Sequence, residues 1–150
     1  MAEVVGVAYP VPYPLLKRIL DEGKTVFVKH PTCFKKLEPG MKVLFYASRE
    51  VRAFLGEATV KSVELMTYAE AKREYGEKLF ISEKEARDYS RPLRGRRSKT
   101  AAPRDIKFLV LALENVKKYE RPVKPKRFVT VGGKYVTKEE YERIAKEGSG

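Results

Sequence analysis

The sequence predicts an α+β fold, a small mixed β-barrel with peripheral helices, from three observations. The chain has 150 residues, the size of one ordinary domain. Its hydrophobic fraction of 43% is sufficient for a packed core. Six or seven strand-like segments are interrupted by helices at three places, and a further helix follows at the end. This order is too irregular for a doubly wound α/β sheet.

The first half of the chain contains four predicted strands and one helix. Val4–Tyr9 is an apolar, β-branched run that Pro10 closes, which is typical of a buried strand. Leucine and isoleucine at helical spacing after Pro12 then predict a helix that Gly23 terminates. The remaining strands are predicted at Thr25–Lys29, at Lys42–Ala47 after the turn Pro39-Gly40, and at Gly56–Val63.

The second half contains three helix starts with the spacing of a capping box. These are Thr67 with Glu70, Ser82 with Glu85, and Thr137 with Glu140. Between them, Phe108–Leu113 is a strongly apolar strand, and Phe128–Val131 and Lys134–Val136 are predicted to form a hairpin around Gly132-Gly133. We therefore expect one domain over 1–145 that includes a basic loop at 90–106, and a frayed tail at 146–150.

The positive charge is concentrated in the second half of the chain. The net charge of +12 divides into +3 for residues 1–75 and +9 for residues 76–150. The densest part, Arg91–Arg104, is dominated by arginine and contains Pro92, Gly95 and Pro103 without a periodic apolar pattern, which predicts a loop. Arginine forks suit bidentate phosphate contacts, so a polyanion such as nucleic acid is indicated. The alternative is a basic, solvated surface.

Other features limit the compartment and the class of protein. A single cysteine, Cys33, excludes an internal disulfide framework, and with His30 it supplies too few ligands for a closed zinc site. No apolar stretch is long enough to span a bilayer, so we expect a cytoplasmic protein with no membrane partner. No glycine-rich phosphate loop follows a strand, and no cofactor is predicted. The absence of glutamine and the presence of one asparagine, Asn115, favour a thermophilic source.

Three segments between residues 14 and 64 carry a resemblance to a known superfamily. They are a helix ending in Gly23-Lys24-Thr25 before strand Val26–Lys29, the turn and strand Leu37–Tyr46, and the strand start Gly56–Val60. In this order they resemble the PUA-like superfamily, especially its ASCH branch and a related archaeal branch of uncharacterised domains. The resemblance implies a pseudo-barrel with a cleft beside the first helix that binds RNA or a modified base. In the ASCH pattern a Gly-x-Lys and a later basic residue line this cleft.

Lys24 and Lys29 stand nearest to that pattern, while the alternative is a helix-capping Gly23 followed by ordinary strand-edge lysines. An amidohydrolase group of similar outline uses a lysine, a threonine three residues later, and a glutamate on a later strand. Phe27 occupies the threonine position here, so no catalytic residue is predicted. Glu57 is expected to be solvated, although Lys24, Lys29, Glu57 and Arg94 around one phosphate would suit a metal-free nuclease.

The sequence thus favours a noncatalytic domain that binds structured or modified RNA. Two alternatives stay open: an RNA- or nucleoside-directed hydrolase using the same cleft, and a module whose basic loop docks an acidic protein. The predicted cleft residues are Lys24, Thr25, Lys29 and Tyr46, and the predicted phosphate contacts are Arg91, Arg94, Arg96, Arg97, Lys99 and Arg104.

Overall fold

The structure is a computed structural model that describes residues 3–31, 33–48, 51–89, 107–125 and 133–149. The predicted basic loop at 90–106 lies outside the described residues. So does the first strand of the predicted hairpin, at 128–131.

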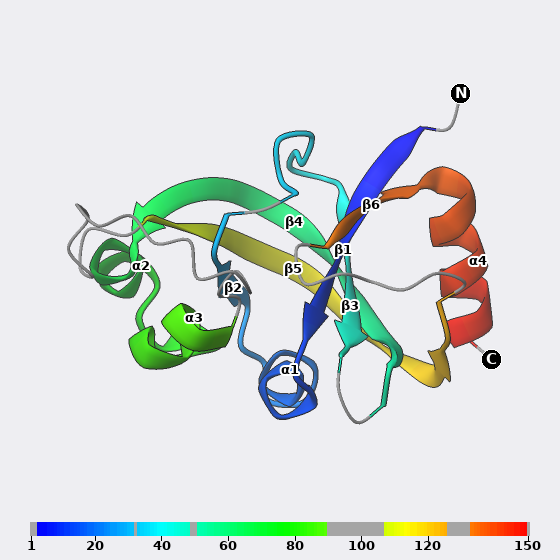
Figure 1. Ribbon diagram of the computed structural model, residues 1–150, viewed down its shortest axis with the longest axis horizontal. Coiled ribbons are helices and arrows are strands. Elements are labelled where there is room, and N and C mark those ends of the chain that lie inside the picture. The colour runs from blue at the N-terminus through cyan, green and yellow to red at the C-terminus, as the bar shows by residue number, and fades with distance from the viewer. Residues whose placement is uncertain (1–2, 32, 49–50, 90–106, 126–132, 150) are drawn as a thin grey trace.

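The described strands form one mixed sheet (Figure 1). Its order is β2-β5-β4-β3-β1-β6. β1 and β3 pair in parallel, and the other described pairs are antiparallel. The α+β class is confirmed, but β2 and β6 lie at the two ends of the described sheet, which is open rather than closed into a barrel. The strands are β1 (Val4–Val11), β2 (Val26–Lys29), β3 (Lys42–Ala47), β4 (Ala53–Thr67), β5 (Lys107–Val123) and β6 (Lys134–Thr137).

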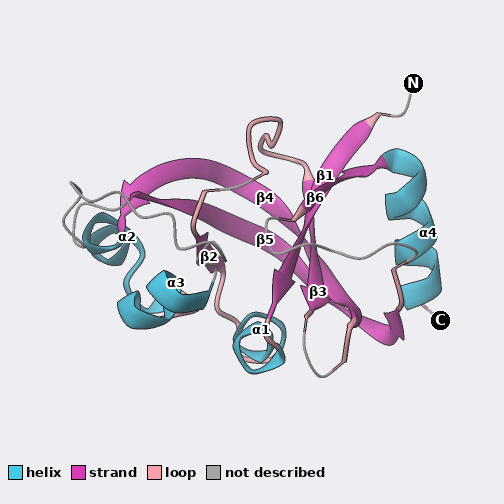
Figure 2. Cartoon of the chain, viewed as in Figure 1, coloured by secondary structure: helices cyan, strands magenta, loops and turns pink. Residues whose placement is uncertain are grey.

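The four α-helices within the described residues lie at the periphery of the sheet, as Figure 2 shows. The capping boxes of α2 and α4 are confirmed, with both reciprocal hydrogen bonds present at Thr67 and at Thr137. Ser82 and Glu85 make the corresponding bonds before α3. The sequence predicts these capping boxes because each box involves residues only three positions apart. The helices are α1 (Tyr13–Leu20), α2 (Tyr68–Tyr75), α3 (Glu83–Tyr89) and α4 (Lys138–Gly148), and a 3₁₀ turn, η1 (Gly76–Lys78), follows α2.

Several boundaries differ from those predicted. β4 has 15 residues and β5 has 17, much longer than the apolar cores at 56–63 and 108–113 that predicted them. The second half of β5 is mostly exposed and polar, so its sequence lacks the apolar run of a buried strand. β6 is part of the predicted hairpin, but its described partner is β1, with Val7 opposite Tyr135. The last helical residue of α1 is Leu20, and Gly23 terminates the helix as predicted, with φ of 77° and the backbone N–H of Lys24 hydrogen-bonded to the carbonyl oxygen of Arg18.

The sheet is packed on both faces, which divides the core into two clusters. Tyr9, Phe27 and Phe45 belong to the larger cluster, which also contains the buried side chains of α1. Leu44 and Tyr46 belong to the smaller cluster, which contains Ile144 of α4. Because successive side chains of a strand point to opposite faces, Phe45 and its neighbours Leu44 and Tyr46 enter different clusters. This alternation decides which residues can share a site.

The last turn of α4 lies within the segment 146–150, where the sequence predicts a frayed tail. The helix continues to Gly148, which is buried against the ring of Tyr119. A Cβ at this position would lie 2.6 Å from the nearest ring carbon of Tyr119, so the close approach requires glycine.

We expect Gly148→Ala to lower the free energy of unfolding by about 1 kcal/mol, because the added methyl group overpacks Tyr119. In an exposed helix interior the same change raises stability by about 1 kcal/mol. Denaturant unfolding measures the sign, and Glu142→Ala on the exposed face of α4 is the control, with an expected effect within about 0.5 kcal/mol. A stabilising Gly148→Ala would show that the helix end is not packed on the sheet.

Candidate functional site

A buried lysine lies at the end of β2. The side chain of Lys29 is 1% exposed, and its Nζ donates a hydrogen bond to the carbonyl oxygen of His30 at 3.0 Å. The same ammonium lies 4.7 Å from the centre of the Tyr9 ring. Burial lowers the pKa of Lys29 to about 8, and the nearby Cys33 acts in the opposite direction. Strongly perturbed lysines of this kind concentrate at functional sites.

Tyr9 and Cys33 complete the surroundings of Lys29. The Tyr9 hydroxyl donates to the carbonyl oxygen of Cys33 at 2.9 Å, and its ring stacks on Phe27 at 5.5 Å between centroids. Burial raises the pKa of Tyr9 far above its ordinary value, and burial also raises the pKa of the Cys33 thiol despite the opposing effect of Lys29. Cys33 is therefore protonated at neutral pH and is a poor nucleophile. We call Tyr9, Lys29, His30 and Cys33 the Lys29 site.

Two basic segments outside the described residues each join the described structure, at their C-terminal ends, beside the Lys29 site. Segment 90–106 continues into β5 at Lys107, next to Phe108, whose ring lies 5.1 Å from the His30 ring. Leu109, one residue further, is the register partner of Lys29. Segment 126–132 continues into Gly133, where a Cβ would lie 2.6 Å from a Tyr9 ring atom. The chain itself therefore ties both segments to the surroundings of one buried cation.

Lys24 lies in a different place from Lys29. It follows α1 and lines an open hollow of about 360 Å³ together with Arg18 and Tyr68. Its Nζ donates to the carbonyl oxygen of Glu77 at 2.8 Å. Five residues of extended chain separate the two lysines by about 16 Å. Lys24 thus lines this hollow together with residues of α1, and Lys29 does not line it.

Opposite charges balance one another around this hollow. Arg18 donates to both carboxylate oxygens of Glu85, at 2.7 and 3.0 Å, and these hydrogen bonds hold the pKa of Glu85 at about 2. Glu22 and Glu77 also line the hollow. A polyanion therefore meets carboxylates as well as cations here, so this hollow suits RNA less well than the Lys29 site.

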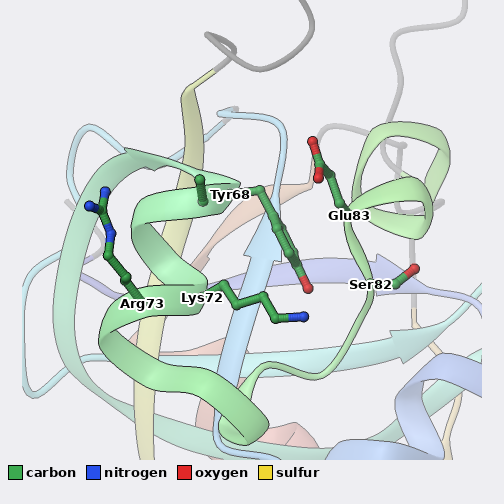
Figure 3. Close-up of a pocket in the computed structure, with 6 residues that line it drawn as sticks. Tyr68, Lys72, Arg73, Ser82 and Glu83 are labelled. Carbon is green, nitrogen blue, oxygen red and sulfur yellow. The ribbon is translucent and has the colours of Figure 1, made fainter.

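A neighbouring hollow of about 510 Å³ separates α2 from the start of α3 (Figure 3). Tyr68 and Lys72 point into it, and Arg73 also lines it. The Tyr68 hydroxyl donates to the carbonyl oxygen of Ile81 at 2.7 Å, so the ring is a fixed wall rather than an exposed stacking surface. Glu83 on the opposite rim again gives the hollow mixed charge.

Two other predicted cleft residues, Thr25 and Tyr46, take part in strand pairing and in the core. The carbonyl oxygen of Thr25 accepts a hydrogen bond from the backbone of Leu113 at 2.8 Å, which extends the pairing of β2 and β5. Tyr46 is 6% exposed in the smaller core cluster, with its ring 5.6 Å from that of Phe54. Tyr46 therefore has little surface for a base and lies on the face of the sheet opposite Tyr9. The six predicted phosphate contacts between Arg91 and Arg104 lie outside the described residues.

Glu57 is buried, and the expectation that it is solvated was wrong. Its side chain accepts hydrogen bonds from Tyr119 at 2.9 Å and from Tyr141 at 2.7 Å, and Lys42 lies 3.7 Å away. Glu57 is the register partner of Leu44, so it belongs to the face of the smaller cluster. The hydrolase alternative required Glu57 to lie beside Lys24 and Lys29. The structure does not bring these residues together.

Within the described ranges, no group of three metal-ligating side chains occurs. None of the described helices has the length and apolar character required to cross a membrane.

Comparison with known proteins identifies the fold and the family. The ASCH protein of Zymomonas mobilis has a similar structure, with a TM-score of 0.73 at 17% identity over 95% of this chain and 94% of that one. A variant of the same protein matches equally well, over 95% of this chain and 97% of that one. The N-terminal domain of Staphylothermus marinus McrB matches with a TM-score of 0.53 at 19% identity, over 99% of each chain.

The predicted resemblance to the ASCH branch is confirmed at the level of the fold. An uncharacterised protein of Methanocaldococcus jannaschii is 40% identical over 111 residues, which cover 71% of this chain and 99% of the relative. The model of one protein family matches residues 4–138 of this chain. By this match the chain belongs to the family described as Domain of unknown function (DUF365).

Proposed function

We propose that this protein is a noncatalytic RNA-binding domain, in which the Lys29 site takes up a nucleotide and segment 90–106 contacts phosphates. The observation that carries the proposal is the attachment of two basic segments beside one buried cation. Segment 90–106 contains six basic residues and one acidic residue, and segment 126–132 adds two basic residues. The two segments thus hold seven of the net twelve positive charges. A polyanion is the partner that this distribution favours.

The energetics of Lys29 support an anionic ligand. A buried ammonium has lost much of its hydration, and its lowered pKa reports that loss. An anion that binds beside it restores favourable electrostatic interaction where the effective dielectric constant is low. The arginines of segment 90–106 offer the planar forks that bind phosphate in bidentate fashion. RNA supplies phosphates together with bases, and the ASCH-like fold agrees with the RNA binding that the sequence resemblance implied.

The described residues favour binding over catalysis. The Cys33 thiol has a raised pKa, and Glu57 lies on the other face of the sheet. Neither supplies the Lys29 site with the base or nucleophile that a hydrolase needs.

We expect the triple variant Arg94→Ala, Arg96→Ala, Arg97→Ala to bind RNA with a weaker dependence on salt. Each phosphate contact that is removed lowers the slope of log K against log salt by about one, so the slope falls by about three. The measurement is fluorescence anisotropy with a labelled RNA hairpin over a series of salt concentrations.

The matched control removes the same number of charges from α4, as Lys138→Ala, Arg143→Ala, Lys146→Ala. If both triple variants change the slope equally, general charge rather than segment 90–106 governs binding. If the wild-type protein binds no RNA but retains an acidic protein partner after nuclease treatment, the docking alternative replaces this proposal.

A further inference from the structure

Tyr135 lies beside the Lys29 site with its ring held in place. It is on β6, directly opposite Val7 of β1, so its side chain lies on the same face of the sheet as those of Val7 and Tyr9. The Tyr135 hydroxyl accepts a hydrogen bond from the backbone N–H of Lys36 at 3.0 Å. The ring is half-buried, and this bond ties it to the loop that follows β2. Tyr135 is therefore positioned before any ligand arrives.

The half-buried ring of Tyr135 has an exposed lysine over it. The Nζ of Lys36 lies 5.4 Å from the ring centroid, and the Lys36 side chain is exposed. Lys35, next in the chain, is exposed as well. An exposed ammonium over a ring is a weak, replaceable contact, and the position it occupies is open to another group that prefers a π face. The neighbouring cations make a nucleotide a suitable occupant, since it combines a flat base with an anionic phosphate.

We infer that an unpaired RNA base stacks on Tyr135 and displaces the ammonium of Lys36, which then contacts the adjacent phosphate. This inference rests on the proposed function and specifies its ligand. Base stacking on an aromatic ring is stronger than an exposed contact between an ammonium and a ring, so the exchange favours binding. Little ordering of the ring is needed, because the bond from Lys36 already fixes it.

The inference selects a class of RNA. Bases in a continuous duplex are stacked on one another and cannot lie on a protein ring, whereas bases in loops and bulges are available. The ligand is therefore an RNA with unpaired bases. Stacking tolerates any base, so little sequence preference arises at this position.

The test uses a labelled RNA hairpin with a loop of about eight nucleotides, the full chain, and equal salt throughout. Tyr135→Leu is expected to weaken binding about tenfold, and Tyr135→Phe, which retains the ring, less than about threefold. Wild-type protein is expected to bind the same hairpin with abasic loop sugars about tenfold more weakly, because the phosphates remain and the bases are gone. Tyr135→Leu should then have little further effect on the abasic RNA.

Tyr13→Leu is the matched control, because Tyr13 is also half-buried and carries the ammonium of Lys17 at 5.6 Å from its ring. It lies on α1 and is expected to leave affinity unchanged. Equal losses for both leucine variants, or an undiminished effect of Tyr135→Leu on the abasic hairpin, would overturn the stacking role. So would equal binding of intact and abasic hairpins by wild-type protein, a result that does not depend on whether the variants fold. Failure of wild-type protein to bind either hairpin would instead refute the proposed function.

Discussion

Lys29→Met is expected to raise the free energy of unfolding at pH 7 by about 3 kcal/mol. Methionine has a shape similar to that of lysine, and the substitution removes a buried charge. The pKa of Lys29 is about 8 in the folded protein against an ordinary 10.5. Between these values the unfolded chain binds more protons than the folded one, so wild-type stability rises with pH. The advantage of Lys29→Met should therefore shrink by about 2 kcal/mol between pH 7 and pH 9.5. Urea unfolding of both proteins at each pH measures this change.

The same variant is expected to lose RNA affinity by on the order of tenfold to a hundredfold at pH 7, because the buried cation no longer faces the ligand. Wild-type affinity should fall toward pH 9.5, where Lys29 is largely neutral, and Lys29→Met should show no such fall. Lys138→Met, at an exposed lysine on α4, controls for charge alone. A stabilised Lys29→Met that binds RNA as tightly as wild type would remove Lys29 from the binding site. A destabilised one would indicate that its hydrogen bond to His30 outweighs the cost of burial.

Glu57→Leu is expected to lower the free energy of unfolding by about 3 to 5 kcal/mol. The substitution leaves the hydroxyls of Tyr119 and Tyr141 without their acceptor and Lys42 without its nearest carboxylate. Burial raises the pKa values of both tyrosines, so their hydroxyls stay protonated donors at neutral pH when the acceptor is removed. Glu57→Gln keeps one acceptor and the volume, and we expect a loss of about 1 to 2 kcal/mol. Thermal and urea unfolding give both values.

Glu64 provides the matched control for Glu57. It accepts one hydrogen bond from Tyr75 at 2.8 Å and is half-buried, so Glu64→Leu should cost less than about 1 kcal/mol. Adding Tyr141→Phe to Glu57→Leu should recover part of the loss, because one unsatisfied hydroxyl disappears. Equal effects of Glu57→Leu and Glu64→Leu would contradict the network under α4.

The separation of Glu57 from Lys29 bears on both candidate activities. Glu57 has a structural role that accounts for its burial, since it joins the sheet to α4 through Tyr141. Lys29 donates a hydrogen bond to the carbonyl oxygen of His30, and burial lowers its pKa. A buried charge that lowers stability is typical of a functional site, where ligand binding rather than folding explains the presence of the residue.

The sequence by itself determined the features that depend on neighbouring residues and on composition. The capping boxes at Thr67 and Thr137 were predictable because a cap involves residues within one helical turn. Strand β3 was predicted at its observed bounds because its apolar run is continuous. The ASCH resemblance and the concentration of charge in the second half followed from the order of elements and from counting.

Only the tertiary structure decided which of these residues meet. Tyr135 joins the Lys29 site because β6 pairs with β1, a contact between distant parts of the chain that no local pattern indicates. Tyr46 and Glu57 enter the opposite core because side chains alternate between the two faces of a strand, so the pairing of whole strands fixes their surroundings. Lys24 and Lys29 are close in sequence but lie apart, because Lys24 precedes β2 and Lys29 is its last residue, and an extended strand carries the chain about 3.3 Å per residue.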